Sequence, residues 1–312
     1  MEKILILKDD SNDFEKFFID KMIRKDVDVY PVYKHFRHKL PYIIRVNHFF
    51  RFKFIPYKSF WYENWKSTIN NYDVIIIFDY LMGIEIIEYI REKNKKCRLI
   101  YWCWNKIEKN PEEIKKSECE IWSFDKSDCK KYHLNYNNQF YFNELDNKEY
   151  EDIYDAVFIG KNKKRVKLLE EIKKHIGNND KVKFLIKPDS NELIDDSNEL
   201  IDDSMILHEN ISYEDVVNLI KHSKCIVDIV KSGQEGLTLR VMESIFYKKK
   251  LITNNIEILN YDLYLKDNIF IVGIDKWERL EEFINSKYVE LKKEILEKYT
   301  YEKWLNNFGI AR

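Results

Sequence analysis

Short apolar runs alternate with amphipathic segments along the first half of the chain. Several runs are apolar at every position, which is typical of strands buried on both faces of a parallel sheet. The predicted strands are residues 4–7, 27–32, 72–79, 98–104 and 120–124. Apolar residues at helical spacing predict helices at 14–23 and 84–93, and Pro111 with the acids after it predicts a short helix. This alternation predicts a doubly wound α/β sheet.

The same pattern begins again after a charged, polar stretch at residues 147–152. The second set of predicted strands is 156–160, 182–186, 225–230, 250–253 and 269–272, with helices at 166–175 and 213–222. We therefore expect two Rossmann-like domains, residues 1–150 and 151–312, that face a cleft. Ligands of such sheets bind outside the carboxyl ends of the strands.

Composition removes several classes of function. The net charge is −1, with 53 basic and 54 acidic residues, which argues against a general nucleic-acid binder. The five cysteines form no C-x-x-C pair, so neither a zinc ribbon nor a disulfide framework is indicated. The chain begins with a strand rather than a signal peptide, and no apolar run approaches the roughly 20 residues that span a bilayer. We expect a cytoplasmic protein.

The most informative stretch runs from Gly233 to Asn255. Gly233 and Gly236 mark a loop after a strand, and Thr238 is the predicted N-cap of the helix that follows. Backbone N–H groups and the helix dipole attract phosphate at such a junction.

Two acids of this stretch, Glu235 in the loop and Glu243 in the helix, have seven residues between them. Carboxylates at this place accept hydrogen bonds from sugar hydroxyls. The alternative is that Glu243 pairs with Arg240 one turn earlier and Glu235 is solvated. The spacing by itself favours that alternative, because 54 acidic residues produce many such pairs.

Glu235-Gly-Leu-Thr-Leu-Arg-Val-Met-Glu243, with Leu251-Ile-Thr-Asn-Asn255 after it, resembles the E-x7-E signature of GT-B glycosyltransferases. It is most similar to the group that acts in the synthesis of bacterial capsule, lipopolysaccharide and other surface glycans. The resemblance implies that Glu235 contacts the sugar of a nucleotide-sugar donor and Glu243 contacts its ribose. It also implies that the largely helical stretch 277–308 crosses back to the first domain.

A basic loop follows the strand that ends in Gly160. Its Lys161 and Arg165 resemble the residues that hold the donor diphosphate in this family, and Lys187 is a further candidate for the same pocket. The alternative is a solvated helix start. Four more residues flank the acidic loop and are candidates for donor binding: Gln234, Gly236, Thr238 and Arg240.

Polar residues also follow the strands of the first domain. Asp79 and Asp10, with Asp9 beside them, are candidate bases for an acceptor hydroxyl. Gly83, Trp104 and Asn105 are candidates for the acceptor side of the cleft.

Three further segments bear on partners. Lys34 to Lys66 is rich in basic and aromatic residues with one acid, which suits peripheral contact with an anionic membrane or, alternatively, internal packing. Residues 190–196 recur unchanged as 197–203, and we assign this duplication no chemistry. Asp26-Val-Asp28 matches the metal clamp of other glycosyltransferases but stands at the start of a strand, so no metal or other cofactor is expected.

Two hypotheses follow from the sequence. The first is a metal-independent glycosyltransferase of the cytoplasmic membrane face, with a glycan or lipid-linked acceptor and no nucleic-acid partner. The alternative is a non-catalytic α/β protein that binds a nucleotide or sugar, a degenerate glycosyltransferase.

Overall fold

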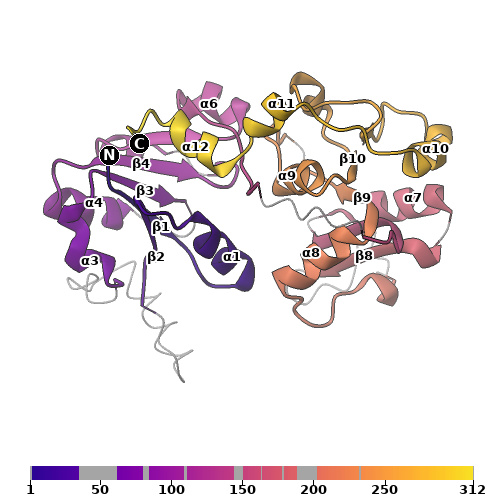
Figure 1. Cartoon of the computed structure of the whole chain (residues 1–312), viewed down its shortest axis with the longest axis horizontal. Helices are drawn as coiled ribbons and strands as arrows, with labels where there is room; N and C mark the ends of the chain where they lie inside the picture. The colour runs from indigo at the N-terminus through magenta and orange to yellow at the C-terminus, as the bar shows by residue number, and fades with distance from the viewer. Residues whose placement is uncertain are drawn as a thin grey trace. The chain divides into compact units, whose positions relative to one another are not determined.

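The computed structural model describes residues 2–34, 62–79, 84–108, 111–143, 150–162, 164–177, 179–187, 202–231 and 233–311. Gly83, the duplicated segment up to residue 201 and most of the stretch Lys34 to Lys66 lie outside the described residues. The chain divides into two compact units (Figure 1). The first comprises residues 1–123, 128–136 and 309–312, and the second comprises 124–127 and 137–308.

The first unit is built on a parallel sheet in the order β2-β1-β3-β4-β5-β6. Its strands are β1 (Ile4–Lys8), β2 (Val27–Pro31), β3 (Val74–Phe78), β4 (Arg98–Cys103), β5 (Glu120–Ser123) and β6 (Asn135–Tyr136). Its helices are α1 (Asp13–Met22), α3 (Trp65–Thr68), α4 (Ile84–Lys93), α5 (Glu112–Lys115) and all but the first two residues of α6 (Lys126–Tyr132), with a 3-10 turn at Ile69–Asn71. The predicted strands and helices of this half are confirmed; α3, α6 and β6 were not predicted.

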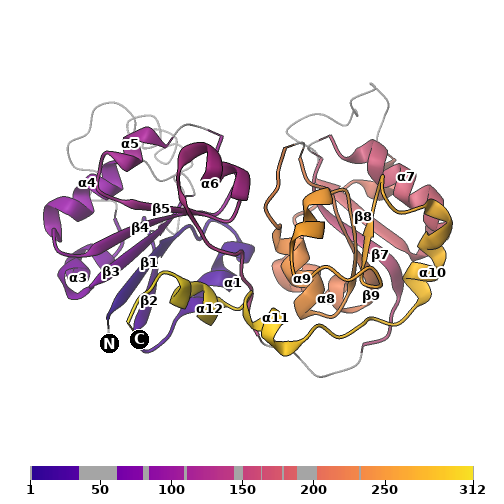
Figure 2. The same cartoon turned by 90° about the horizontal axis from the view of Figure 1, so that it is seen from above.

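Helices cover both faces of this sheet (Figure 2). α3 and α4 pack on one face, where Ile86, Ile87 and Ile90 contact the buried side chains of β1 and β3. α1 lies on the other face and buries Phe18, Ile19 and Met22. All five residues of β1 and of β3 are buried, which explains why these strands are apolar almost throughout.

The second unit has a parallel sheet in the order β11-β10-β9-β7-β8. Its strands are β7 (Tyr154–Lys161), β8 (Val182–Lys187), β9 (Ser223–Asp228), β10 (Lys250–Thr253) and β11 (Ile269–Ile271). Its helices are α7 (Val166–Ile176), α8 (Tyr213–Lys221), α9 (Leu239–Phe246), α10 (Leu280–Asn285), α11 (Lys293–Glu297) and α12 (Tyr301–Asn307). Short 3-10 turns stand at Asn179–Lys181, Asp203–Met205, Ile256–Asn260 and Trp277–Arg279.

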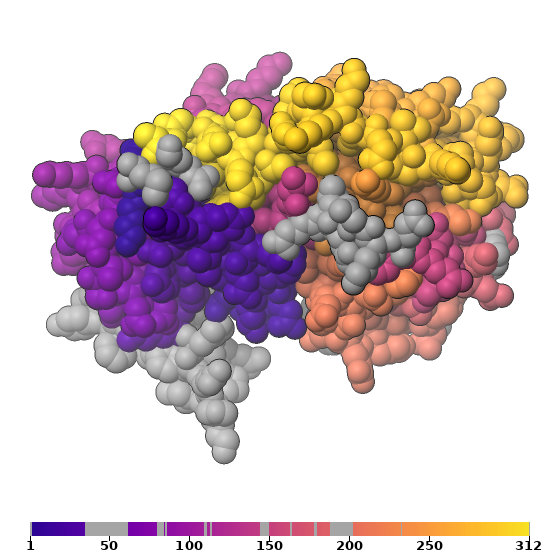
Figure 3. Space-filling view, in the orientation of Figure 1, coloured from indigo at the N-terminus to yellow at the C-terminus, as the bar shows by residue number. Residues whose placement is uncertain are grey.

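The two faces of the second sheet carry different helices (Figure 2). α7 and α10 supply apolar side chains to the core on one face, including Leu169, Ile172 and Phe283. α8 and α9 lie on the other face, and the side chains of Ser212 and Thr238 cap their N-termini, as Thr238 was predicted to do. The segment after β11, orange to yellow, covers one side of this unit in the space-filling view (Figure 3).

The stretch 277–308 is largely helical, as predicted, but it is not one continuous helix. It forms short helices separated by extended backbone, because α10 ends at Ser286 with an extended conformation. The amide side chain of Asn268 then bonds both the N–H and the carbonyl of Val289, at 2.8 and 2.7 Å. These bonds satisfy backbone groups that a continuous helix would have paired within itself. The predicted crossing of this stretch to the first domain stays a prediction.

Candidate functional sites at the strand ends

Each sheet reverses its strand order once, and that point is where doubly wound sheets bind ligands. In the first unit the reversal lies between β1 and β3, whose carboxyl ends are Lys8 and Phe78. In the second unit it lies between β7 and β9, which end at Lys161 and Asp228. Most of the predicted site residues lie at one of these two places.

Asp79 follows β3 directly and is half-buried. Its Oδ2 accepts a hydrogen bond from the backbone N–H of Asn105 at 3.3 Å. Its Oδ1 is shielded from solvent and has no hydrogen-bond partner among the described residues. Burial raises the pKa of Asp79 to about 7, against the opposing effect of the Asn105 and Trp104 hydrogen bonds and the Lys8 charge. A carboxyl group with such a pKa is suited to take a proton near neutral pH.

Lys8 is a neighbour of Asp79 that was not predicted as a site residue. It ends β1, is 1% exposed, and forms an ion pair with Glu15 of α1. Its ammonium lies 5.3 Å from the ring centre of Phe78 and 5.1 Å from that of Trp104. Burial lowers the pKa of Lys8 to about 7, against the charges of Asp9 and Asp79.

The predicted acceptor-side residues with described positions therefore meet around Lys8 and Asp79. Trp104 is 8% exposed and covers Lys8, whereas Asn105 is exposed and bonds Asp79 through its backbone. Asp10 follows β1 and is half-buried.

Asp228 is a buried acid of the second unit that was not predicted as a site residue. It is fully buried at the end of β9. Its Oδ2 accepts a hydrogen bond from the Thr238 hydroxyl at 2.9 Å, and Nη1 of Arg240 lies 3.7 Å from its Oδ1. Burial raises the pKa of Asp228, while the charge of Arg240 and the bond from Thr238 act in the opposite direction. Arg240 is therefore paired with Asp228, whereas the sequence suggested Glu243 as its partner.

Two guanidinium groups lie near the ring of Phe158, at the carboxyl end of β7. Those of Arg240 and Arg165 are 5.0 and 5.9 Å from the ring centre. Arg240 also bonds the carbonyl of Ile159, and a Cβ on Gly160 would fall 2.6 Å from its Nη2. The glycine at this strand end therefore leaves room for Arg240.

Further cations stand at the ends of β7 and β8. Lys161 and Lys187 are paired in register, and both are exposed. Lys187 donates to the side chain of Asn210, and Arg165 is 8% exposed and donates to the carbonyl of Lys161 at 3.4 Å. Together with Arg240, these side chains bring positive charge to the strand ends of the second unit.

The predicted acidic loop leads into α9. Gln234 and Glu235 are half-buried, and Gly236 is buried. The backbone N–H groups of Glu235 and Gly236 both donate to the carboxylate of Asp125. Asp125 was not predicted as a site residue.

Glu243 faces a cluster of tyrosines. Its Oε1 accepts a hydrogen bond from the Tyr213 hydroxyl at 2.7 Å. The Tyr213 hydroxyl also lies 2.7 Å from the hydroxyl of Tyr141. Tyr141 in turn contacts the hydroxyl of Tyr247 at 3.1 Å. Glu243 is 5% exposed, and burial raises its pKa to about 7 despite the Tyr213 hydrogen bond.

This pKa predicts a pH dependence of stability. Between about pH 4.5 and 7 the folded state keeps a proton on Glu243 that the unfolded state has released, so the free energy of unfolding falls as pH rises. The fall is at most about 3 kcal/mol. We expect Glu243→Gln to remove this component, so that its melting temperature declines less than that of wild type from pH 5 to 8. Glu214→Gln on the exposed face of α8 is the control, and equal slopes in all three proteins would contradict the expectation.

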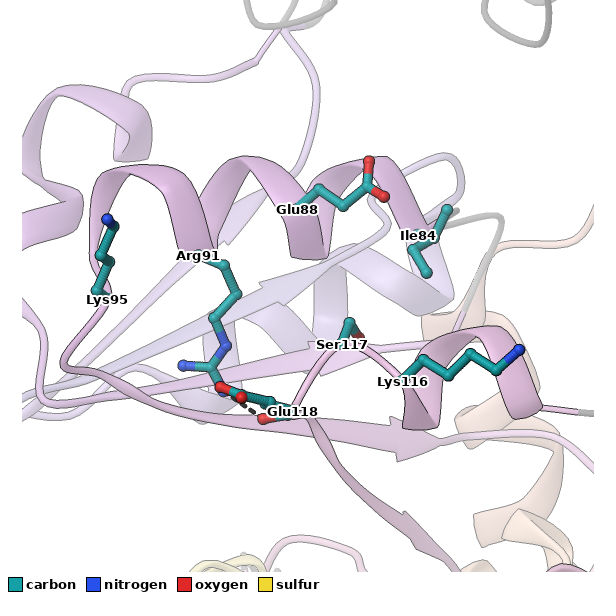
Figure 4. A pocket seen from close by; sticks show the side chains of 7 residues that line it. All are labelled: Ile84, Glu88, Arg91, Lys95, Lys116, Ser117 and Glu118. Carbon is teal, nitrogen blue, oxygen red and sulfur yellow. Dashed lines mark hydrogen bonds between the residues drawn. The ribbon is translucent and has the colours of Figure 1, made fainter.

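A separate hollow of about 570 Å³ lies on the outside of the first unit (Figure 4). It is lined by α4 and the turn before β5, with Glu88, Lys95 and Lys116 among its side chains. Arg91 crosses it and donates to the carbonyls of Cys97 and Glu118, so it braces the turn. The hollow runs along the helical layer, and we assign it no chemistry.

The described residues contain no group of three His, Cys, Asp or Glu side chains placed to hold a metal ion. Among them there is also no helix with the length and apolar character needed to cross a bilayer.

No protein-family model matches the chain, and no curated protein matches it. Its structure is similar to an α-glucosyltransferase in complex with UDP and a 13-mer DNA with a central A:G mismatch, with a TM-score of 0.61 and 12% identity over 99% of both chains. A DNA-modifying β-glucosyltransferase, solved with and without uridine diphosphoglucose, matches with a TM-score of 0.51 and 13% identity over 99% of this chain and 95% of the other. T4 phage β-glucosyltransferase matches with a TM-score of 0.50 and 12% identity over 99% and 96%. The predicted fold is confirmed: two α/β units of the GT-B glycosyltransferase type.

Proposed function

We propose that this protein is a glycosyltransferase that moves a sugar from a nucleotide-sugar donor, which its second unit binds. The observation that carries the proposal is the cluster of cations at the carboxyl ends of β7 and β8, next to the strand-order reversal of that unit. Lys161 and Lys187 end neighbouring strands, and Arg165 lies beside them. Cations at this position bind a diphosphate and stabilise the charge that develops on it as it departs.

The remaining donor contacts follow from the resemblance in the sequence. Glu235, Gln234 and Thr238 are proposed to bind the sugar, with Gly236 and Arg240 shaping their loop. Glu243 is proposed to contact the ribose. Because its Oε1 already bonds Tyr213, the hydroxyl of Tyr213 belongs to the same subsite.

The first unit is proposed to bind the acceptor, with Asp79 as the base for its hydroxyl and Asp10 as the other candidate. A glycan or lipid-linked acceptor of a bacterial surface polysaccharide is the first candidate. It fits a metal-independent enzyme of the cytoplasmic membrane face that makes peripheral contact through the segment Lys34 to Lys66. The basic and aromatic composition of that segment supports this choice.

DNA is the second candidate acceptor. It is favoured by the similarity to an α-glucosyltransferase in complex with DNA and to a DNA-modifying β-glucosyltransferase. Incubation with labelled nucleotide sugar and either duplex DNA or a bacterial lipid extract separates the two candidates. Label in the lipid fraction supports the first, and label in DNA supports the second.

A thermal-shift panel tests the donor site and the non-catalytic alternative. UDP, GDP, CDP and their sugars are added with and without EDTA, because binding to the folded state raises the melting temperature. We expect one nucleotide series to bind without metal, and Lys161→Gln to weaken its affinity about tenfold. Lys164→Gln, an exposed change in the same loop, is the matched control. A protein that no nucleotide stabilises would contradict the proposal, and binding without turnover would favour the degenerate transferase.

A further inference from the structure

The side chain of Asp125 forms hydrogen bonds with the backbone of the loop that contains Glu235. Asp125 follows β5, and residues 124–127 belong to the second unit. It is fully buried. Its Oδ2 accepts the backbone N–H groups of Glu235 at 3.1 Å and Gly236 at 3.0 Å. Its Oδ1 accepts the backbone N–H and the hydroxyl of Ser127, at 2.9 and 2.5 Å. Both carboxylate oxygens are therefore committed to fixed donors.

The residues around these hydrogen bonds are closely packed. A Cβ on Gly236 would fall 2.6 Å from two carbons of the Phe124 ring and 3.1 Å from Cα of Asp125. The ammonium of the next residue, Lys126, lies 4.0 Å from the ring centre of Tyr261. The segment 124–127 thus contacts the rest of the second unit through three successive side chains, and Asp125 holds the loop by hydrogen bonds.

This arrangement changes what the loop can bind. The N–H groups of Glu235 and Gly236 are directed at a carboxylate of the chain itself, so they are not open to a donor phosphate. A phosphate that came close would also face the negative charge of Asp125. The diphosphate is therefore left to the cations at the ends of β7 and β8. The loop still presents the side chain of Glu235. The backbone next to this side chain is fixed by the hydrogen bonds from the N–H groups of Glu235 and Gly236 to Asp125.

We propose that Asp125 is a positioning residue for the donor sugar: by bonding two successive N–H groups of the loop, it fixes the orientation of the Glu235 carboxylate. This inference rests on the proposed function, because it takes Glu235 as the contact of the sugar. It assigns Asp125 no contact with the diphosphate. Removing Asp125 should therefore affect the sugar part of the donor and spare the nucleoside diphosphate part.

Two measurements on Asp125→Ala and Asp125→Asn test the inference. The first is amide hydrogen exchange of the peptide around residues 233–238. We expect exchange to be about a hundredfold faster in Asp125→Ala, because two N–H groups lose their acceptor. Asp125→Asn keeps one oxygen as an acceptor and should give a smaller increase. Asp275→Asn is the matched control, since Asp275 also accepts a backbone N–H, that of Ile271 at 2.8 Å, elsewhere in the same unit.

The second measurement compares the affinities for the nucleotide sugar and for the free nucleoside diphosphate. We expect Asp125→Ala to weaken nucleotide-sugar binding about tenfold and to change nucleoside diphosphate binding less than twofold. A general structural defect would weaken both ligands alike. Unchanged amide exchange, or equal loss of both ligands, would overturn the inference while leaving the proposed function intact. A wild-type protein that binds neither ligand would overturn both.

Discussion

Replacing Arg240 with methionine is expected to lower the free energy of unfolding by about 3 kcal/mol. Arg240 faces Asp228, which is fully buried, and the substitution leaves that carboxylate without its nearest cation. The Thr238 hydroxyl alone does not replace a charge. The value is at the low end for a broken buried ion pair, since the Arg240 side chain is 22% exposed and Arg165 also acts on Asp228. Urea unfolding followed by circular dichroism measures the loss.

The double variant Arg240→Met with Asp228→Asn separates the lost charge pairing from lost packing. Removing the buried charge as well should recover more than half of the stability, because an amide costs less to bury unpaired than a carboxylate. Arg279→Met is the control, because its ion pair with Asp275 lies elsewhere in the same unit. A loss below about 1 kcal/mol for Arg240→Met would show that the pair contributes no more than a surface salt bridge.

Asp79→Asn is expected to lower turnover by about a hundredfold or more, as the loss of a general base does. The wild-type rate should rise with pH through about 7, because burial raises the pKa of Asp79 to about 7 and only the ionised carboxylate accepts a proton. The variant should lose this rise while keeping its donor affinity. Steady-state rates from pH 5 to 9 measure both effects.

The turnover of Asp10→Asn should be compared with that of Asp79→Asn, because Asp10 is the other candidate base. We expect this variant to retain most of the turnover and the same dependence on pH. If Asp10→Asn is inactive and Asp79→Asn is not, the roles are exchanged. If neither variant loses the rise with pH, the base lies elsewhere.

The elements of the fold were predictable because burial in parallel sheets leaves a direct trace in the sequence. Val74 to Phe78 is apolar at each position because both of its faces are covered. The helix at Ile84–Lys93 was predicted with its observed bounds. Thr238 was predicted as a cap because a threonine before an apolar helical stripe signals a helix start. Such signals lie within a few residues and need no tertiary knowledge.

The site was less predictable because its contacts join distant residues. The bond between Asp125 and the Glu235 N–H spans 110 positions, and nothing near Asp125 in the sequence marks it. Lys8 and Asp228 did leave a signal, since each is a charged residue at the end of a buried strand. Charged residues are rarely buried without a partner, so these two positions indicated a paired site. Nothing in the sequence identified the tyrosines around Glu243, because 21 tyrosines are spread along the chain.

Release of nucleoside diphosphate from UDP-, GDP- and CDP-sugars shows whether this protein transfers sugar from a nucleotide donor. The assay compares wild type with Glu235→Ala, supplies DNA or lipid extract as acceptor, and uses Glu257→Ala, a half-buried acid of the same unit, as control. We expect wild type and the control to consume one donor series, and Glu235→Ala to be slower by about a hundredfold. Consumption of no donor by the wild type, or equal rates in all three proteins, would contradict it.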